Sequence, residues 1–185
     1  MVSMEMGEEH PMILAIDPGN IDSAYSIIDH ETLKPVDFNK VNNLELLDIL
    51  ECWVKGIKPW DAIVIEMVAH YGKGMPAGKE VFDTCVWIGR ITQFLKDKGV
   101  TTNLIYRGEV KLNLCGDMRA KDSNVIQALI DRFAYGVPNK GKGIVNKKVN
   151  QPGWFYGFKS DIWQACACAV TYYDLYLSKE RGGDK

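Results

Sequence analysis

The sequence contains neither a long apolar run nor a positively charged stretch at its start. No apolar run approaches the roughly 20 residues that a transmembrane helix requires. Residues 1–11 carry three glutamates and no basic residue, whereas a secretory signal opens with positive charge. We therefore expect a cytoplasmic protein with no membrane partner.

The sequence also lacks the cysteine spacing of a zinc ribbon or a disulfide scaffold. Its five cysteines, at positions 52, 85, 115, 166 and 168, form no C-x-x-C pair and are odd in number. This pattern favours buried thiols in a reducing compartment. Cys166 and Cys168 are expected to be small packing residues of the last helix.

Disordered and fibrous classes are excluded by composition, since 46% hydrophobic and 25% charged residues are typical of a globular chain. A chain of 185 residues fits one domain, and we expect residues 1–10 to form a flexible tail on it.

The net charge of −2 conceals an uneven distribution of charge along the chain. Ten of the 22 Lys and Arg residues, but only four of the 24 Asp and Glu residues, lie between Arg107 and Ser160. This split predicts a basic face or loop beside an acidic one. An ordinary solvated lysine surface is the alternative.

Hydrophobic periodicity predicts an α/β domain. It opens with an antiparallel hairpin unit and continues in helical crossovers. Residues 135–158 contain no acid and read as a long loop. Strands are expected at 12–17, 23–29, 34–41, 61–67 and 100–106, and helices at 43–55, between 79 and 98, and at 108–115, 122–135 and 160–177.

Three acids stand where predicted elements begin or end. Asp17 closes the first strand, Glu66 closes the central strand, and Asp161 opens the last helix. Strand carboxyl ends gather at one edge of such a sheet, and a cluster of carboxylates suits Mg²⁺ or Mn²⁺. Two such ions about 3.5–4 Å apart would activate water against a phosphodiester. Taken singly, each acid also fits a turn former, a surface acid or a favourable charge at a helix start.

Four ordered blocks resemble those of the RuvC family of Holliday-junction resolvases: ILAIDPGNIDSAYSIID, DAIVIEMVAHYGKG, EVKLNLCGDMRAKDSNVIQALIDRF and SDIWQACACAVTYYDLY. The resemblance covers roughly residues 12–135 and 159–176. The third block, V-K-x-x-x-x-G-x-x-x-A-K, is the most discriminating. The resemblance implies a ribonuclease-H-like fold, with a central mixed sheet flanked by helices.

The resemblance also implies a set of metal ligands. Asp17 and Glu66 match the family's first two metal-binding carboxylates. The last helix of the family carries an acid followed three residues later by a second one. One register places Asp161 and Gln164 on this pair; a rival register places Phe158 and Asp161 there. In both, the site has one carboxylate fewer than is usual, and an amide oxygen is a weaker ligand.

Basic residues supply the expected DNA contacts. Lys111 and Lys121 match two family positions near the scissile phosphate, and Arg119 lies beside the second. Tyr71 and Lys73 follow Glu66 where the family inserts a flexible segment into the junction. Residues 135–159 read as a basic insertion loop in which Lys140, Lys142, Lys147, Lys148 and Lys159 supply charge and Trp154, Phe155 and Tyr156 supply stacking faces. Exposed helix lysines and a disordered, solvated loop are the alternatives.

The resemblance implies a metal-dependent endonuclease that cleaves Holliday junctions and other branched DNA by phosphodiester hydrolysis, with Mg²⁺ as cofactor and Mn²⁺ as substitute. Two symmetric nicks imply a homodimer. The pI of about 5.9 and small size suit a phage-type member, which would act in the host cytoplasm. Two alternatives stay open: another ribonuclease-H-like nuclease that cuts RNA–DNA hybrids or flaps, and a non-catalytic binder of branched DNA.

Overall fold

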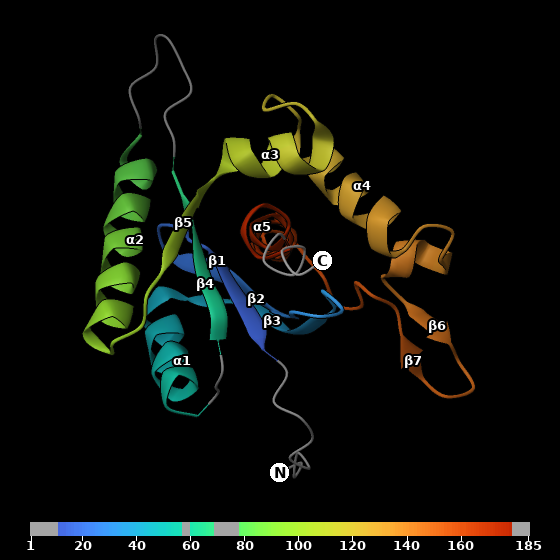
Figure 1. Cartoon of the computed structure of the whole chain (residues 1–185), viewed down its shortest axis with the longest axis horizontal. Coiled ribbons are helices and arrows are strands. Elements are labelled where there is room, and N and C mark those ends of the chain that lie inside the picture. The colour runs from blue at the N-terminus through green and yellow to red at the C-terminus, as the bar shows by residue number, and fades with distance from the viewer. Residues whose placement is uncertain (1–10, 57–59, 69–77, 179–185) are drawn as a thin grey trace, which may run out of the picture.

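A mixed five-stranded sheet forms the centre of the domain (Figure 1). The computed structural model describes residues 11–56, 60–68 and 78–178. The strand order is β3-β2-β1-β4-β5; the first three strands are antiparallel, and β4 and β5 continue the sheet in parallel with β1. The strands are β1 (Met12–Asp17), β2 (Asp22–Asp29), β3 (Pro35–Asn42), β4 (Trp60–Met67) and β5 (Asn103–Tyr106).

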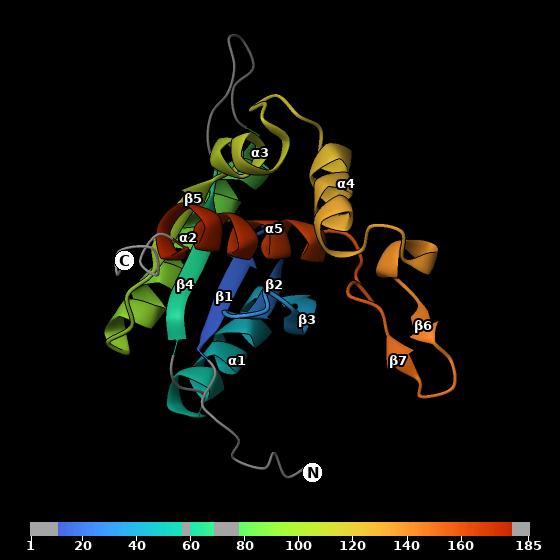
Figure 2. The same ribbon diagram turned by 45° about the vertical axis from the view of Figure 1, so that its right-hand side comes forward.

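Helices cover both faces of this sheet, which explains why the central strands are almost wholly apolar. On one face, α1 (Asn43–Gly56) and α2 (Lys79–Asp97) pack on alternate residues of β1 and β4, such as Leu14 and Ile63. On the other face, α5 (Ile162–Tyr172) lies across the strands (Figure 2), with α3 (Arg107–Cys115) and α4 (Asp122–Phe133) beyond it. The expected fold class is therefore confirmed, and so is the expected order of elements outside residues 135–158.

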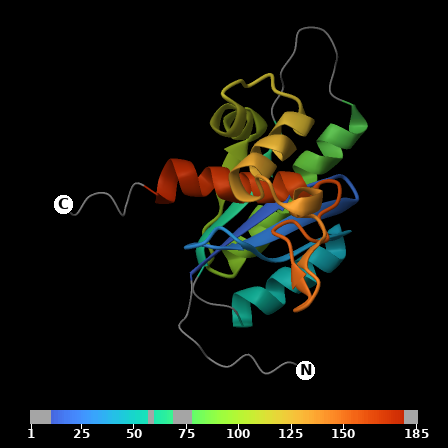
Figure 3. The ribbon, with the colours of Figure 1, turned by 90° about the vertical axis from the view of Figure 1, so that its right-hand side faces the viewer.

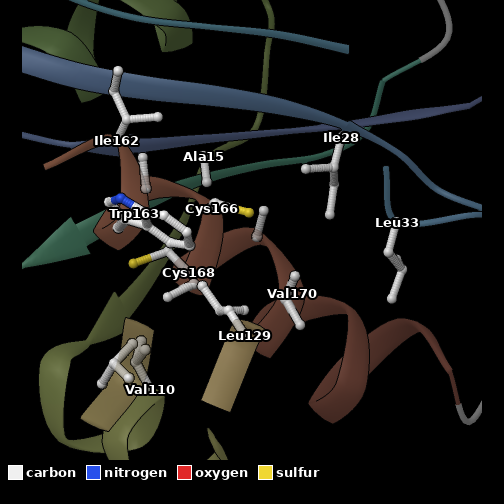
Figure 4. Close-up of a cluster of buried hydrophobic side chains, with 14 of the residues drawn as sticks. Ala15, Ile28, Leu33, Val110, Leu129, Ile162, Trp163, Cys166, Cys168 and Val170 are labelled. Atoms are coloured by element: carbon white, nitrogen blue, oxygen red, sulfur yellow. The ribbon is translucent and has the colours of Figure 1, made fainter. Parts of the chain in front are cut away.

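Small side chains let α5 approach the sheet closely. Residues 165–169, Ala-Cys-Ala-Cys-Ala, are at most 1% exposed. Figure 4 shows Cys166 and Cys168 within the core, with Cys166 next to Ala15 of β1. The α-helix ends at Tyr172, and a π-helical turn follows from Tyr173 to Leu177. This close packing fixes the start of α5 relative to the carboxyl ends of the strands.

Residues 135–158, expected to form a long loop, contain short regular elements that the sequence pattern did not predict. This segment holds a short 3₁₀ helix (Pro138–Gly141) and a hairpin of β6 (Ile144–Asn146) and β7 (Gln151–Pro152). The hairpin extends away from the central sheet (Figures 1 and 2), on the side that faces the viewer in Figure 3. At its base, a Cβ atom on Gly153 would lie 2.2 Å from the carbonyl oxygen of Gly141, so that two backbones meet where no side chain fits.

Aromatic residues anchor this hairpin to the domain. Phe155 is fully buried, and the ring of Trp154 stacks on Phe133 with centroids 5.0 Å apart. The expectation that Phe155 offers a stacking face to DNA is therefore wrong, because core contacts already cover its ring; Tyr156 remains half exposed.

The cysteines are all unpaired, but they are not all buried. Cys166 and Cys168 lie in the core, Cys85 and Cys115 are half-buried, and Cys52 is exposed on α1. Every helix in the described part of the chain is too short or too polar to cross a bilayer.

Candidate active site

The three predicted acids converge at one edge of the sheet. Asp17 ends β1, Glu66 lies one residue before the end of β4, and Asp161 directly precedes α5. Burial raises the pKa of Asp17 well above its usual range, and the negative charges of Glu66 and Asp161 raise it further. This repulsion is what a shared cation would relieve.

Asp17 and Asp161 line one open pocket of about 350 Å³. Asp22, which the sequence analysis did not select, lines it as well. The turn between β1 and β2 forms the floor, and a Cβ atom on Gly19 would lie 2.3 Å from the carbonyl oxygen of Asp22. The remaining lining residues are Pro18, Asn20, Ile21 and Lys40.

A buried polar bridge fixes this turn. The Ser23 hydroxyl donates to Oδ1 of Asn43 over 2.5 Å, and Nδ2 of Asn43 donates to the carbonyl oxygen of Gly19 over 2.9 Å. Asn43 begins α1, so this helix is tied directly to the loop that follows Asp17. The bridge holds the pocket floor rigid.

Glu66 is held by two groups that the sequence analysis did not predict. Nη1 of Arg107 donates to both Glu66 carboxylate oxygens, over 3.1 and 2.9 Å, and the Cys168 thiol donates to Oε2 over 3.4 Å. Burial raises the pKa of Glu66, while Arg107 opposes the shift. Cys168 is therefore more than a packing residue. Arg107 directly follows β5, which runs parallel to β4 and pairs its Ile105 with Glu66. Its place at the end of the neighbouring strand was the signal from which its contact with Glu66 could have been predicted.

Asp161 is also paired with a cation of the chain. Nζ of Lys40 lies 2.6 Å from its Oδ2, and both side chains are partly exposed. Lys40 comes from β3, so the pair joins the edge strand to the start of α5. Phe158, which the rival register places on the first position of the pair, packs against Phe38 with ring centroids 4.5 Å apart.

The oxygen atoms of the site are of the kind that a divalent cation binds, but their positions in this structure do not form a coordination shell. Gln164 is 5% exposed, and its Oε1 has no hydrogen-bond partner among the residues that the structure describes, so that one buried oxygen is available as a ligand. Nevertheless, no group of three or more His, Cys, Asp or Glu side chains in the described ranges is arranged to hold a metal ion. Arg107 and Lys40 hold two of the carboxylates instead. The Mg²⁺ ligand set stays a prediction.

Of the predicted DNA-contacting lysines of α3 and α4, one lies beside the site. Nζ of Lys111 is 3.4 Å from Asp122, which also accepts from Nη2 of Arg107 over 3.1 Å. This network connects Lys111 to Glu66. Lys121 and Arg119 are exposed and lie outside it.

The lysines of residues 135–159 are all exposed. Lys142 lies over the Trp163 ring, 5.1 Å from its centroid, so the base of the hairpin is close to the start of α5 and to Asp161. Lys147 and Lys148 lie between β6 and β7 at the hairpin tip. Tyr71 and Lys73 lie outside the described residues, as does the predicted tail at 1–10.

Comparison with solved structures shows that this fold is shared. RuvC of Thermus thermophilus superposes with a TM-score of 0.60 at 15% identity, covering 91% of this chain and 96% of that chain. Thermus RuvC in complex with a Holliday junction substrate gives 0.61 at 16% identity, covering 92% and 97%. The fowlpox virus Holliday junction resolvase gives 0.51 at 15% identity, covering 88% and 97%.

No protein-family model matches the sequence, and no curated protein matches it either. The structural likeness is nevertheless spread over most of the chain. The fold is ribonuclease-H-like, and the resemblance to RuvC resolvases that the motifs indicated is confirmed at the level of fold.

Proposed function

We propose that this protein is a metal-dependent endonuclease that cleaves four-way junctions and other branched DNA. The observation that carries the proposal is the convergence of Asp17, Glu66 and Asp161 at the edge of a sheet whose fold is shared with junction resolvases. A bound divalent cation would supply a nucleophilic water and stabilise the charge that develops on the phosphate.

The residues of the site divide into two roles. Asp17, Glu66, Asp161 and the amide oxygen of Gln164 would hold Mg²⁺, or Mn²⁺ as its substitute. Lys111, which lies at the rim, would neutralise the scissile phosphate. Hydrolysis would join the water oxygen to phosphorus and release the 3′-oxygen, leaving a 5′-phosphate and a 3′-hydroxyl.

The hairpin would extend the DNA-binding face. Its lysines are exposed, and its base packs beside the start of α5. Lys121 and Arg119 lie on the α3–α4 side of the site. DNA that reached the pocket would thus meet positive charge on both sides, and phosphate contacts of this kind supply most of non-specific affinity.

A second copy of the chain would complete the enzyme, because resolving a four-way junction takes two symmetric nicks. One face of α2 is suited to this contact, since Phe82 and Val86, one helical turn apart, are each 61% exposed. The buried face of α2, which includes Ile88, Ile91 and Leu95, packs in the core of the domain.

This part of the proposal can be tested by light scattering. Phe82→Asp should convert a dimer into a monomer, while Leu44→Asp on α1, which changes a side chain of similar exposure (59%), should not. A wild-type chain that is monomeric at all concentrations would exclude this interface.

The cleavage assay uses the full chain with a four-way junction, a Y-fork, a linear duplex and an RNA–DNA hybrid, each with Mg²⁺, Mn²⁺ or a chelator. Junction cutting that needs the metal and is lost in Asp17→Asn supports the proposal. Asp48→Asn, an exposed acid on α1, is the matched control. Preference for the hybrid would favour another ribonuclease-H-like nuclease.

A non-catalytic junction binder is the second candidate. It is favoured by Gln164 in place of an acid and by the two carboxylates that cations of the chain already hold. Tight junction binding without cleavage in either metal would establish it.

A further inference from the structure

Two of the three converging carboxylates already have a positively charged partner from the chain. Glu66 accepts from Arg107 over 2.9 Å, and Asp161 pairs with Lys40 over 2.6 Å. Asp17 accepts no hydrogen bond from any residue that the structure describes, although the charges of both cations act on it. Two cations of the chain thus offset two of the three carboxylates at this edge of the sheet.

Both cations have a second acid within their reach. Nη2 of Arg107 lies 3.1 Å from Asp122, so Arg107 can release Glu66 and remain paired with Asp122. Lys40 lines the pocket together with Asp22, whose negative charge also acts on it. Neither cation depends on one carboxylate alone for its charge compensation.

The ionised carboxylate of Glu66 requires a positively charged partner. Its side chain is 11% exposed, and a buried carboxylate that loses its partner is strongly destabilising. An ionised Glu66 therefore needs a cation beside it, and the candidates are the guanidinium of Arg107 and a metal ion. Because both need the same carboxylate oxygens, they compete.

We propose that Arg107 and Lys40 are exchangeable counter-ions of this site. They hold Glu66 and Asp161 in place while no metal is bound, and a divalent cation binds by replacing them. This inference rests on the proposed function for the presence of the metal. Its consequence is that the two side chains lower the affinity for metal, because the ion must displace each of them.

The expected sizes differ between the two positions. A hydrogen bond to a charged, mostly buried group contributes enough that Arg107→Gln should bind metal about tenfold more tightly. The Lys40 pair is partly exposed, so Lys40→Gln should gain only about two- to fivefold. Glutamine keeps an amide donor for the carboxylate and removes the charge.

The test is a Mn²⁺ titration of the full chain without DNA, with free Mn²⁺ measured by electron paramagnetic resonance. The matched controls are Lys34→Gln on the β2–β3 turn and Arg90→Gln on α2, both exposed and outside the site. Tighter binding in both site variants with unchanged controls is expected. If Arg107→Gln does not fold, the result for Lys40→Gln decides the test. Lys40→Gln should fold, because the Lys40–Asp161 pair is partly exposed.

Each other outcome overturns the inference in a distinguishable way. If the wild type binds Mn²⁺ and cleaves junctions but neither variant binds more tightly, the exchange is wrong and the proposed function stands. If neither the wild type nor the variants bind Mn²⁺ at millimolar concentration, the exchange and the metal-dependent function fail together.

Discussion

Removing the two lysines at the hairpin tip tests whether the hairpin contacts DNA. Lys147 and Lys148 are exposed, and neither ammonium group takes part in a hydrogen bond or ion pair within the described chain. Their replacement by alanine should therefore change the free energy of unfolding by less than about 0.5 kcal/mol each. Any loss of DNA affinity would then reflect lost contacts with phosphate and not a damaged fold.

The magnitude follows from counter-ion release. Each lost contact with a duplex phosphate lowers the slope of log K against log salt by about 0.9, so the double variant should lose about 1.8. At 0.1 M salt this corresponds to an affinity about 60-fold weaker, and the difference should vanish as the salt approaches 1 M. Preference for a junction over a duplex should survive, because these contacts carry no branch-specific information.

Fluorescence anisotropy with labelled junction and duplex, over a series of salt concentrations, measures both quantities. The control is Lys34→Ala with Lys96→Ala, two exposed lysines on the β2–β3 turn and on α2. A hairpin variant whose salt slope equals that of the wild type, or of the control pair, would refute the reasoning. The basic face would then have to lie around Lys111, Arg119 and Lys121.

Three further predictions concern the site and its support. Asp17→Asn should raise the melting temperature near pH 7, because the raised pKa of Asp17 means that its ionised form opposes folding. This gain should disappear below the ordinary carboxyl pKa, because Asp17 of the wild type is then protonated in both the folded and the unfolded state. Gln164→Asp should narrow the rate gap between Mn²⁺ and Mg²⁺ in the junction assay, and equal wild-type rates in both metals would contradict this. Phe155→Ala should lower the free energy of unfolding, measured by a urea titration, by about 3–5 kcal/mol because Phe155 is fully buried. If Phe155 belonged to a solvated loop, the same substitution would change the free energy of unfolding little.

The elements were predictable where the local pattern is strong. Residues 13–16 and 62–65 are continuous apolar runs, and they form the buried central strands β1 and β4. Because strand carboxyl ends share an edge, the positions of Asp17 and Glu66 followed from these runs alone. Asp161 followed from its place before the helix.

The pairings within the site were not predictable, because they join elements far apart in the chain. Lys40 and Asp161 are 121 residues apart, and Arg107 and Glu66 are 41 apart. Only the order and register of the strands bring them together. Residues 138–155 escaped prediction because Phe155 gains its burial from the two helices that flank the segment, through Phe133 of α4 and Trp163 of α5, and not from a local periodicity.

The position of Cys168 beside the site could have been predicted from helical spacing alone. It lies seven residues after Asp161 and four after Gln164, so all three occupy one face of α5, whereas Cys166 lies on another face and packs toward the sheet. The repeated A-C pattern concealed this difference, because both positions are fully buried.

The amide at Gln164 and the two internal cations act on metal binding in the same direction. When ionised, Asp17, Glu66 and Asp161 carry three negative charges, and Arg107 with Lys40 offsets two of them. A site with so little net negative charge should bind a divalent ion weakly until DNA adds a phosphate, which is how Mg²⁺ sites are commonly completed. Linkage then requires metal and DNA each to tighten the binding of the other by the same factor. Mn²⁺ affinity should therefore rise on addition of a non-hydrolysable four-way junction, and junction affinity should rise equally on addition of Mn²⁺. Equal Mn²⁺ affinities with and without junction would mean that the carboxylates alone hold the ion.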